Sequence, residues 1–415
     1  MNLSEKNNIL SERASNTRRR HKEMSCITRT FKIDQSHLRL DQKESLKMVF
    51  VEAKWVYNSI LASLKEGKKL SDINYKDYNK VGHYTKDKEL IESEVKYLAA
   101  SVKQEIIAQF GNQLKAIKSL NKNSHKTGQL KFISDFNSLS FKQYGMTHRI
   151  EGSNKIKIQG IKKPIRVRGL KQLEELKEAE YTTLKLIKRA DEYFIALTVF
   201  SKPERKASTP LNKPVGIDMG IKDHLTLSDG RTFNVMVGES ERLKRLQKKL
   251  SRQKKGSNNH YRTRIQIQRE YMKMEWKKND LANKICNDLL SSYSHVYFQD
   301  ENLNGWKVRY GKTIQHSVLG RVKSTLRRHK DQCTMLSRYL PTTKLCPECG
   351  SLNESITLQD RSFKCSHCGY FHPSRDVHAA CNMIKIGQGL AESKACGDSF
   401  KEPLKQEAAG SSAQR

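Results

Sequence analysis

Four cysteines in the last quarter of the chain form the pattern with the clearest chemistry. Cys346 and Cys349 make one CxxC knuckle, Cys365 and Cys368 make a second, and 15 residues separate the two. Each knuckle can place two thiolates on one Zn²⁺, and two facing knuckles complete a tetrahedral site. A glycine follows each knuckle, where the chain must turn tightly. The spacing therefore predicts one structural zinc ion, because four thiolates leave no open position for catalysis.

The surrounding histidines and cysteines leave alternatives open. The four cysteines could be unrelated buried residues, although their spacing and the flanking glycines disfavour this. His367 and His372 are candidate substitute ligands. In a chain without a signal-peptide pattern, two CxxC pairs indicate metal binding rather than disulfides, so we expect a reducing, cytoplasmic compartment. The other five cysteines are scattered and are expected to be bystanders: Cys26, Cys286, Cys333, Cys381 and Cys396.

Several acidic residues lie in contexts that suit a hard metal ion. Asp218 stands inside the apolar run VGIDMGI, where a buried acid is costly unless it is paired or metal-bound. Its alternative role is to cap the turn that follows. Asp300 and Glu301 both end a predicted strand, and periodicity does not choose between them. Asp376 opens an apolar helix, where its simplest role is an N-cap. Two-metal cleavage of a phosphodiester requires such oxygen ligands for Mg²⁺.

The charge of the chain points to a polyanionic partner. Lys and Arg total 78 against 44 acidic residues, which gives a net charge of +34 over 415 residues. An excess of this size destabilises the compact state unless a polyanion neutralises it. We therefore expect a nucleic-acid partner. Charge alone does not separate RNA from DNA, or binding from cutting. No stretch approaches the roughly 20 apolar residues of a membrane span.

The first half of the chain is predicted to be a β-rich platform with a helical insert. Residues 1–24 are polar and basic, and we expect them to be disordered until bound. The platform spans 25–203: a strand over 26–34, helical periodicity over 41–66 and 88–120, and short strands over 129–201. The helical insert is placed at about 38–125. Residues 204–214 are interpreted as a linker from their Pro, Ser and Lys content.

The second half, 215–388, is predicted to be a ribonuclease-H-like α/β domain. The order is a three-strand meander at 215–233, a basic helical stretch at 238–294 broken near 254–259, and a strand at 294–301. A helix over 316–337 follows, then the ribbon at about 342–372 and a last helix from 376 to 388. The fifth strand that such a domain needs is hard to see in this sequence. Residues 389–415 are Ala/Ser/Gly-rich and are expected to be disordered.

The combination resembles the split RuvC nuclease domain of the TnpB transposon proteins and of the miniature type V-F CRISPR effectors. The resembling segments are GIDMGIKDHLTLSDG, QDENLNGW, the run from LPTTKLCPECG to FKCSHCGYFHPSRD, and VHAACNMIKIG, and their order matches over 212–388. The first half is similar only in layout, as a β-barrel-like wedge with a helical recognition insert. The resemblance implies that Asp218, Glu301 and Asp376 are the catalytic acids and hold two Mg²⁺ ions. It thus selects Glu301 over Asp300.

The resemblance also implies the function. The chain would be an RNA-guided DNA endonuclease of the prokaryotic cytoplasm that binds a guide RNA and cuts double-stranded target DNA. We favour a CRISPR effector over a transposon-encoded TnpB-type nuclease, with a guide-dependent DNA-binding regulator or a transposase as further alternatives. A homodimer on one guide RNA is expected from resemblance only. Candidate nucleic-acid contacts are Lys222, Arg375, Trp306 and Tyr310.

Two details remain open at this level. Residues 302–315 carry two glycines around Trp306 and Tyr310, and they could form a mobile lid over the cleft or an ordinary surface loop. Members of the family often carry Asn two residues after the last acid, whereas this chain has His378. We expect a modest effect of this departure, because no metal ligation depends on that position.

Overall fold

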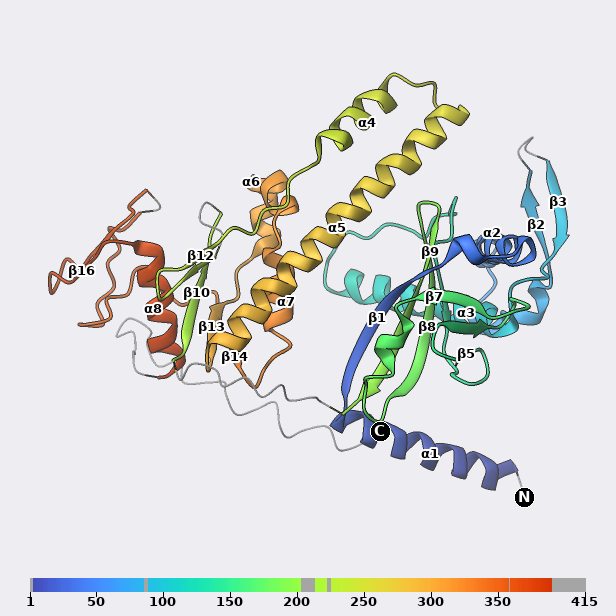
Figure 1. The fold of residues 1–415 in the computed structure, drawn as a ribbon, viewed down its shortest axis with the longest axis horizontal. Coiled ribbons are helices and arrows are strands. Elements are labelled where there is room, and N and C mark those ends of the chain that lie inside the picture. Colours follow the sequence, from blue (N-terminus) through green and yellow to red (C-terminus); the bar gives the residue numbers. More distant parts are fainter. Residues whose placement is uncertain (1–2, 86–88, 203–212, 222–224, 358, 390–415) are drawn as a thin grey trace. The chain divides into compact units, whose positions relative to one another are not determined.

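The structure, a computed structural model, describes residues 3–85, 89–202, 213–221, 225–357 and 359–389 (Figure 1). It divides into two compact units, Met1–Arg205 and Lys206–Arg415. The division falls inside 204–214, the segment interpreted as a linker, of which residues 204–212 lie outside the described residues. The predicted C-terminal tail also lies outside them, apart from residue 389. None of the described helices combines the length and the apolar character that a membrane span requires.

The first unit is built on a seven-stranded antiparallel sheet with the order β4-β8-β9-β1-β7-β6-β5. The helices α2 (Leu40–Lys65) and α3 (Ala100–Lys122) lie between β1 and β4 in the chain. Their apolar faces share one core with the sheet, in which Leu46, Ile60 and Phe110 are fully buried. The strands are β1 (Ser25–Ile33), β4 (Ser138–Phe141), β5 (His148–Glu151), β6 (Lys155–Ile158), β7 (Ile165–Arg168), β8 (Glu180–Arg189) and β9 (Glu192–Ser201).

Three expectations for this unit are corrected. Residues Leu3–Glu23 form a helix, α1, instead of a disordered segment; near its end His21 stacks on Phe200 at 3.7 Å and bonds Glu180. The helix predicted over 88–120 begins only at Ala100, because residues before it form a hairpin of β2 (Lys80–Tyr84) and β3 (Leu90–Glu94). The run LKFI (130–133) is not a strand. Short apolar runs do not distinguish the periodicity of a helix from that of a strand.

The second unit is built on a five-stranded mixed sheet with the order β12-β11-β10-β13-β14. The first three strands form an antiparallel meander, whereas β10 pairs with β13, and β13 with β14, in parallel. Parallel neighbours need crossover connections, and helices provide them. The strands are β10 (Val215–Met219), β11 (Leu225–Leu227), β12 (Thr232–Phe233), β13 (Val296–Gln299) and β14 (Cys333–Leu336). The helices are α4 (Glu241–Ser251), α5 (Asn258–Ser292), α6 (Leu303–His316), α7 (Leu319–Leu326) and α8 (Arg375–Gly387).

The fifth strand, which the sequence did not reveal, is β14. The helix predicted over 316–337 ends at Leu326 in α7, and the chain returns to the sheet at Cys333. Met335, which lies inside the predicted helix, instead pairs with Phe298 in the parallel ladder. Four residues of strand are too short for periodicity to separate them from a helix that precedes them. The break at 254–259 between α4 and α5 was predicted correctly.

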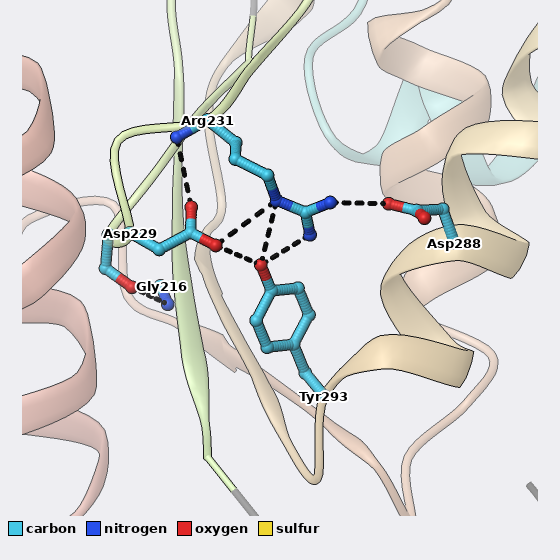
Figure 2. Close-up of polar contacts among 6 residues, drawn as sticks. Gly216, Asp229, Arg231, Asp288 and Tyr293 are labelled. Carbon is cyan, nitrogen blue, oxygen red and sulfur yellow. Dashed lines mark hydrogen bonds and ion pairs between the residues drawn. The ribbon is translucent and has the colours of Figure 1, made fainter. Parts of the chain in front are cut away.

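A polar network fastens the β11–β12 turn to the end of α5 (Figure 2). The hydroxyl of Tyr293 donates to Asp229, and the guanidinium of Arg231 donates to that hydroxyl. Arg231 also pairs with Asp229 at 3.2 Å and with Asp288 at 3.4 Å. Although burial opposes it, the hydrogen bond from Tyr293 lowers the pKa of Asp229. These acids are therefore neutralised by the chain's own groups.

Candidate functional site

The last helix approaches the first strand of the sheet very closely at one glycine. A Cβ added to Gly216 would lie 1.8 Å from the backbone oxygen of Ala380, so only glycine allows α8 to pack on β10 in this way. Asp218 follows Gly216 by two residues and shares its face of the strand. Asp376 precedes Ala380 by four residues and shares its face of the helix. The contact therefore brings the two carboxyl groups toward each other.

Asp218 is a half-buried acid in an otherwise buried strand. Burial, followed by the charges of Asp376 and Glu301, raises the pKa of Asp218 to about 7. That effect requires Asp376 and Glu301 each to lie near Asp218, because like charges disfavour ionisation only at short range. Asp218 on β10 thus lies within electrostatic range of the other two acids that the resemblance selected, at the end of β13 and the start of α8.

Asp300 and Glu301 have different surroundings, which the sequence could not show. Asp300 forms ion pairs with Lys323 and Arg338, and the hydrogen bond from Lys323 lowers its pKa. The Glu301 carboxylate has no hydrogen bond or ion pair among the described residues, and burial raises its pKa. Lys323 also donates to the backbone oxygen of Glu301 at 2.7 Å. Asp300 therefore holds two cations, and Glu301 is left available to a metal.

Asp376 is not the N-cap of its helix. That position belongs to Ser374, whose side chain accepts from the amide of Val377 at 3.3 Å. The Asp376 carboxylate instead accepts from the neighbouring Arg375 guanidinium at 3.3 Å. Arg375 is 9% exposed and also donates to the Thr357 carbonyl at 2.9 Å. Its burial suits a residue that orients Asp376 better than one that contacts an external phosphate.

The four cysteines form a single cluster whose ligand sulfurs all lie within 4.8 Å of one another. Sγ of Cys346 lies 3.6 Å from that of Cys368, and Cys349 and Cys365 are separated by the same distance. The glycines after the knuckles have φ of 69° and 77°, as the tight turns required. The cluster therefore has the number and type of donors that a tetrahedral metal site needs. The predicted substitute ligand His367 is exposed, and it is not part of the cluster.

Asn353 supports this cluster and was missed in the sequence. It is 2% exposed, and its amide nitrogen lies 3.6 Å from Sγ of Cys365. Its oxygen accepts from the amide of Ser366 at 2.7 Å. Burial opposes ionisation of Cys365, but amide donors and Asn353 lower its pKa to about 6. A lone Asn four residues after a knuckle carries no signal that would have identified it.

His378 links α8 to the ribbon. It is 1% exposed, stacks on Phe363 at 3.8 Å, and its Nε2 lies 3.0 Å from the Leu345 carbonyl. Burial lowers the pKa of His378 to about 4, so it is neutral near pH 7. The departure from the family's Asn thus falls at a packing position that joins the helix of Asp376 to the cysteine cluster.

The remaining predicted contacts are not brought together. Lys222 lies outside the described residues. Residues 302–315 form most of helix α6, in which only Tyr310 has non-helical backbone angles. They are therefore neither the mobile lid nor the ordinary surface loop that was expected. Trp306 packs partly buried against the core of the unit, whereas Tyr310 is 47% exposed. A contact of either ring with nucleic acid stays a prediction.

Comparison with known proteins finds two family models that match parts of the chain. The model described as "Probable transposase" (OrfB_IS605) matches residues 197–308, and the model described as "Cas12f1-like, TNB domain" matches 319–383. The two matches contain the segments of Asp218 and Glu301 and the four cysteines with Asp376. The predicted resemblance to the TnpB and Cas12f1-like family is confirmed.

Two curated relatives carry related names. "Putative RNA-guided DNA endonuclease" from Streptomyces pristinaespiralis is 30% identical over 255 residues, which cover 57% of this chain and 60% of the relative. "Putative RNA-guided DNA endonuclease InsQ" from Escherichia coli K12 is 28% identical over 232 residues, covering 49% of this chain and 57% of the relative. The matches thus span less than two thirds of the length of either relative.

Two solved structures resemble the chain at low identity. A Cas12f1 chain in a complex with sgRNA and target DNA gives a TM-score of 0.42 at 13% identity, covering 83% of this chain and 81% of that one. The mini-RNA-guided endonuclease CRISPR-Cas_phi3 gives 0.41 at 9% identity, covering 90% and 93%.

Proposed function

We propose that the protein is an RNA-guided DNA endonuclease that cuts DNA by metal-dependent hydrolysis of a phosphodiester. One observation carries the proposal: Asp218, Glu301 and Asp376, distant in sequence, converge closely enough for the latter two to raise the pKa of Asp218. The names of the two curated relatives support the same activity. The parallel and antiparallel order of the five strands supports a RuvC-type, ribonuclease-H-like domain over 215–388.

We infer that Asp218, Glu301 and Asp376 hold two Mg²⁺ ions. Their donors are carboxylate oxygens, which Mg²⁺ prefers, and their mutual repulsion would be relieved by a cation. When bound, a pair of such ions supplies activation of water and stabilisation of the attacking and leaving oxygens. The chain's own contribution is to place the acids: Lys323 fixes the backbone at Glu301, and Arg375 orients the Asp376 carboxylate.

The cysteine cluster fits one structural Zn²⁺. Its four sulfurs leave no open coordination position, and Asn353 with the knuckle amides supports the thiolates. Through His378 and Arg375, the ribbon contacts the helix that carries Asp376. We infer that zinc holds the fold that positions the third acid and takes no part in the cutting itself.

The partners we propose are a guide RNA and double-stranded target DNA. Phosphate contacts from the 78 Lys and Arg residues would supply affinity, while base pairing with the guide reads the sequence. The first unit would act as a wedge with a recognition insert that binds the guide. The guide would come from a CRISPR array, with the protein acting as a type V effector. The "Probable transposase" match over 197–308 favours the second candidate, a transposon-encoded TnpB-type nuclease.

A cleavage assay with the native guide tests the proposal. The protein should cut a matching duplex only when both guide and Mg²⁺ are present, and Asp218→Ala should abolish cutting while guide binding is retained. A wild-type complex that binds its guide and matching DNA but never cuts would leave a guide-dependent regulator as the function.

Two further measurements separate the finer alternatives. Sequencing the RNA that copurifies with the protein should return repeat-spacer transcripts for a CRISPR effector, or RNA overlapping the protein's own gene for a transposon nuclease. Light scattering of the guide complex should give two chains per guide if the proposed homodimer forms.

A further inference from the structure

A large cavity with many charged residues in its lining lies beside Glu301, within the second unit. Its volume is about 990 Å³, and α5, α6 and α7 supply most of its lining, with Glu301 in the wall. Six cations line it: Lys278, Lys307, Arg321, Lys323, Arg327 and Arg338.

Four of these cations are already engaged by the protein. Arg321 pairs with Glu275, and Lys278 donates to the Gln315 carbonyl. Lys323 and Arg338 both pair with Asp300. Two carboxylates, Glu275 and Asp300, thus balance about half of their charge, and these contacts hold the four side chains in place. They form the wall of the cavity and are poorly placed to follow a mobile ligand.

Arg327 and Lys307 are different. Arg327 ends α7, its side chain is exposed, and no polar partner is described for it. Lys307 stands on α6, is exposed, and has only a 3.4 Å contact with Asn304 one turn away. The two cations therefore line the same cavity from different helices, and neither has an ion-pair partner among the described residues. Such an arrangement attracts an anion that can span the cavity.

We propose that this cavity seats backbone phosphates of the DNA strand that is cut, with Arg327 and Lys307 as the contacts. The inference rests on the proposed nuclease function, because Glu301 in the wall places the cavity beside the acid cluster. A phosphodiester backbone carries the complementary charge in a linear array, and its contacts are independent of sequence. Trp306 and Tyr310, the ring contacts predicted on α6, are not among the described residues that line the cavity.

The test measures binding rather than cutting. The guide-loaded complex carries Asp218→Ala to prevent cleavage, and its affinity for a matching target with a single-stranded displaced strand is measured at 50 mM and 200 mM salt. Each phosphate contact with a single strand adds about 0.7 to the salt slope. The double variant Arg327→Ala/Lys307→Ala should therefore lose about sevenfold less affinity across this range than its parent.

A matched control and a positional probe make the test specific. Arg328→Ala removes a neighbouring exposed arginine that bonds Thr325 and does not line the cavity, so its salt slope should equal the parent's. Arg327→Lys should keep most of the slope. Neutral methylphosphonates placed singly along the DNA should weaken binding at one or two positions in the parent, and not in the double variant.

The outcomes are distinct. An unchanged slope in the double variant, or an equal loss in Arg328→Ala, overturns the proposed contacts. If neutral methylphosphonates weaken binding only when they are placed in the guide RNA, the assignment of the site to DNA is overturned. Because no step requires cleavage, failure of the nuclease assay with this binding pattern intact would remove the proposed function and leave the phosphate site standing.

Discussion

Two groups of acidic residues lie in the second unit, and their carboxyl groups have opposite electrostatic surroundings. Asp229 and Asp288 are neutralised by Arg231, and Tyr293 donates to Asp229, whose pKa is lowered (Figure 2). The carboxylates of Asp218 and Glu301 have no hydrogen bond or ion pair within the described part of the chain, Asp376 has only its neighbour Arg375, and the pKa of Asp218 is raised to about 7. Acids that serve the fold are supplied with internal partners. Acids that are held together against their own repulsion require a partner from outside, and this distinguishes the functional cluster.

The largest expected effect comes from the two adjacent acids after β13. Glu301→Gln should reduce guide-dependent cleavage on the order of 10³-fold or more, because it removes a metal ligand. Asp300→Asn should reduce it by about tenfold or less, because Asp300 pairs with Lys323 and Arg338. Single-turnover cleavage rates at saturating Mg²⁺ measure both. If Asp300→Asn lowered the cleavage rate more than Glu301→Gln, the metal ligand would be Asp300, and the contrast between paired and unpaired acids would not hold.

The cysteine cluster is a third case, in which the protein prepares the ligands for a metal. Asn353→Ala removes the amide beside Cys365 and the acceptor of Ser366. Loss of such supporting contacts typically weakens metal affinity 10–100-fold, and we expect a loss in this range. Competition with a chromophoric chelator measures the zinc affinity. Ser362→Ala, on the same ribbon but exposed, should change nothing, and an equal loss there would indicate general loosening of the ribbon.

The two acidic clusters should respond oppositely to loss of charge. In metal-free protein, burial and the neighbouring acids raise the pKa of Asp218 above its unfolded value, so its ionisation destabilises the folded state as pH rises from about 4 to 7. Asp218→Asn should therefore stabilise the protein at pH 8, on the order of 2 kcal/mol, and by roughly a third of that amount at pH 5. Asp229 has a lowered pKa, so its stabilisation is present above pH 4 and is lost on acidification.

Asp229→Asn should accordingly destabilise the protein at pH 8, by about 0.5–1 kcal/mol because the pairs are exposed. Urea unfolding in the presence of a chelator, at pH 5 and pH 8, gives both differences. If the two variants shift stability in the same direction at pH 8, the contrast between the clusters does not hold.

The sequence predicted the ligands better than the contacts that arrange them. Strand β10 around Asp218 and the four-cysteine spacing are local patterns, and both are found as predicted. The close packing of α8 on β10 depends on Gly216 meeting Ala380, which no local periodicity encodes. The same holds for strand β14, whose four residues are stabilised by pairing with β13. The choice of Glu301 over Asp300 came from the resemblance, and its physical reason is found only in the tertiary ion pairs of Asp300.

The smallest expected effect tests whether the neutralised cluster is purely structural. Tyr293→Phe removes the hydroxyl that donates to Asp229 and accepts from Arg231, while the 3.2 Å ion pair of those two residues remains. One lost buried hydrogen bond costs about 1 kcal/mol, and cleavage should be unchanged. Tyr297→Phe is the matched control: Tyr297 is similarly buried at 8% exposure, and no hydrogen bond of its hydroxyl is described. A fall in cleavage with Tyr293→Phe alone would mean that the network positions the nuclease site, since its turn joins the strand next to β10.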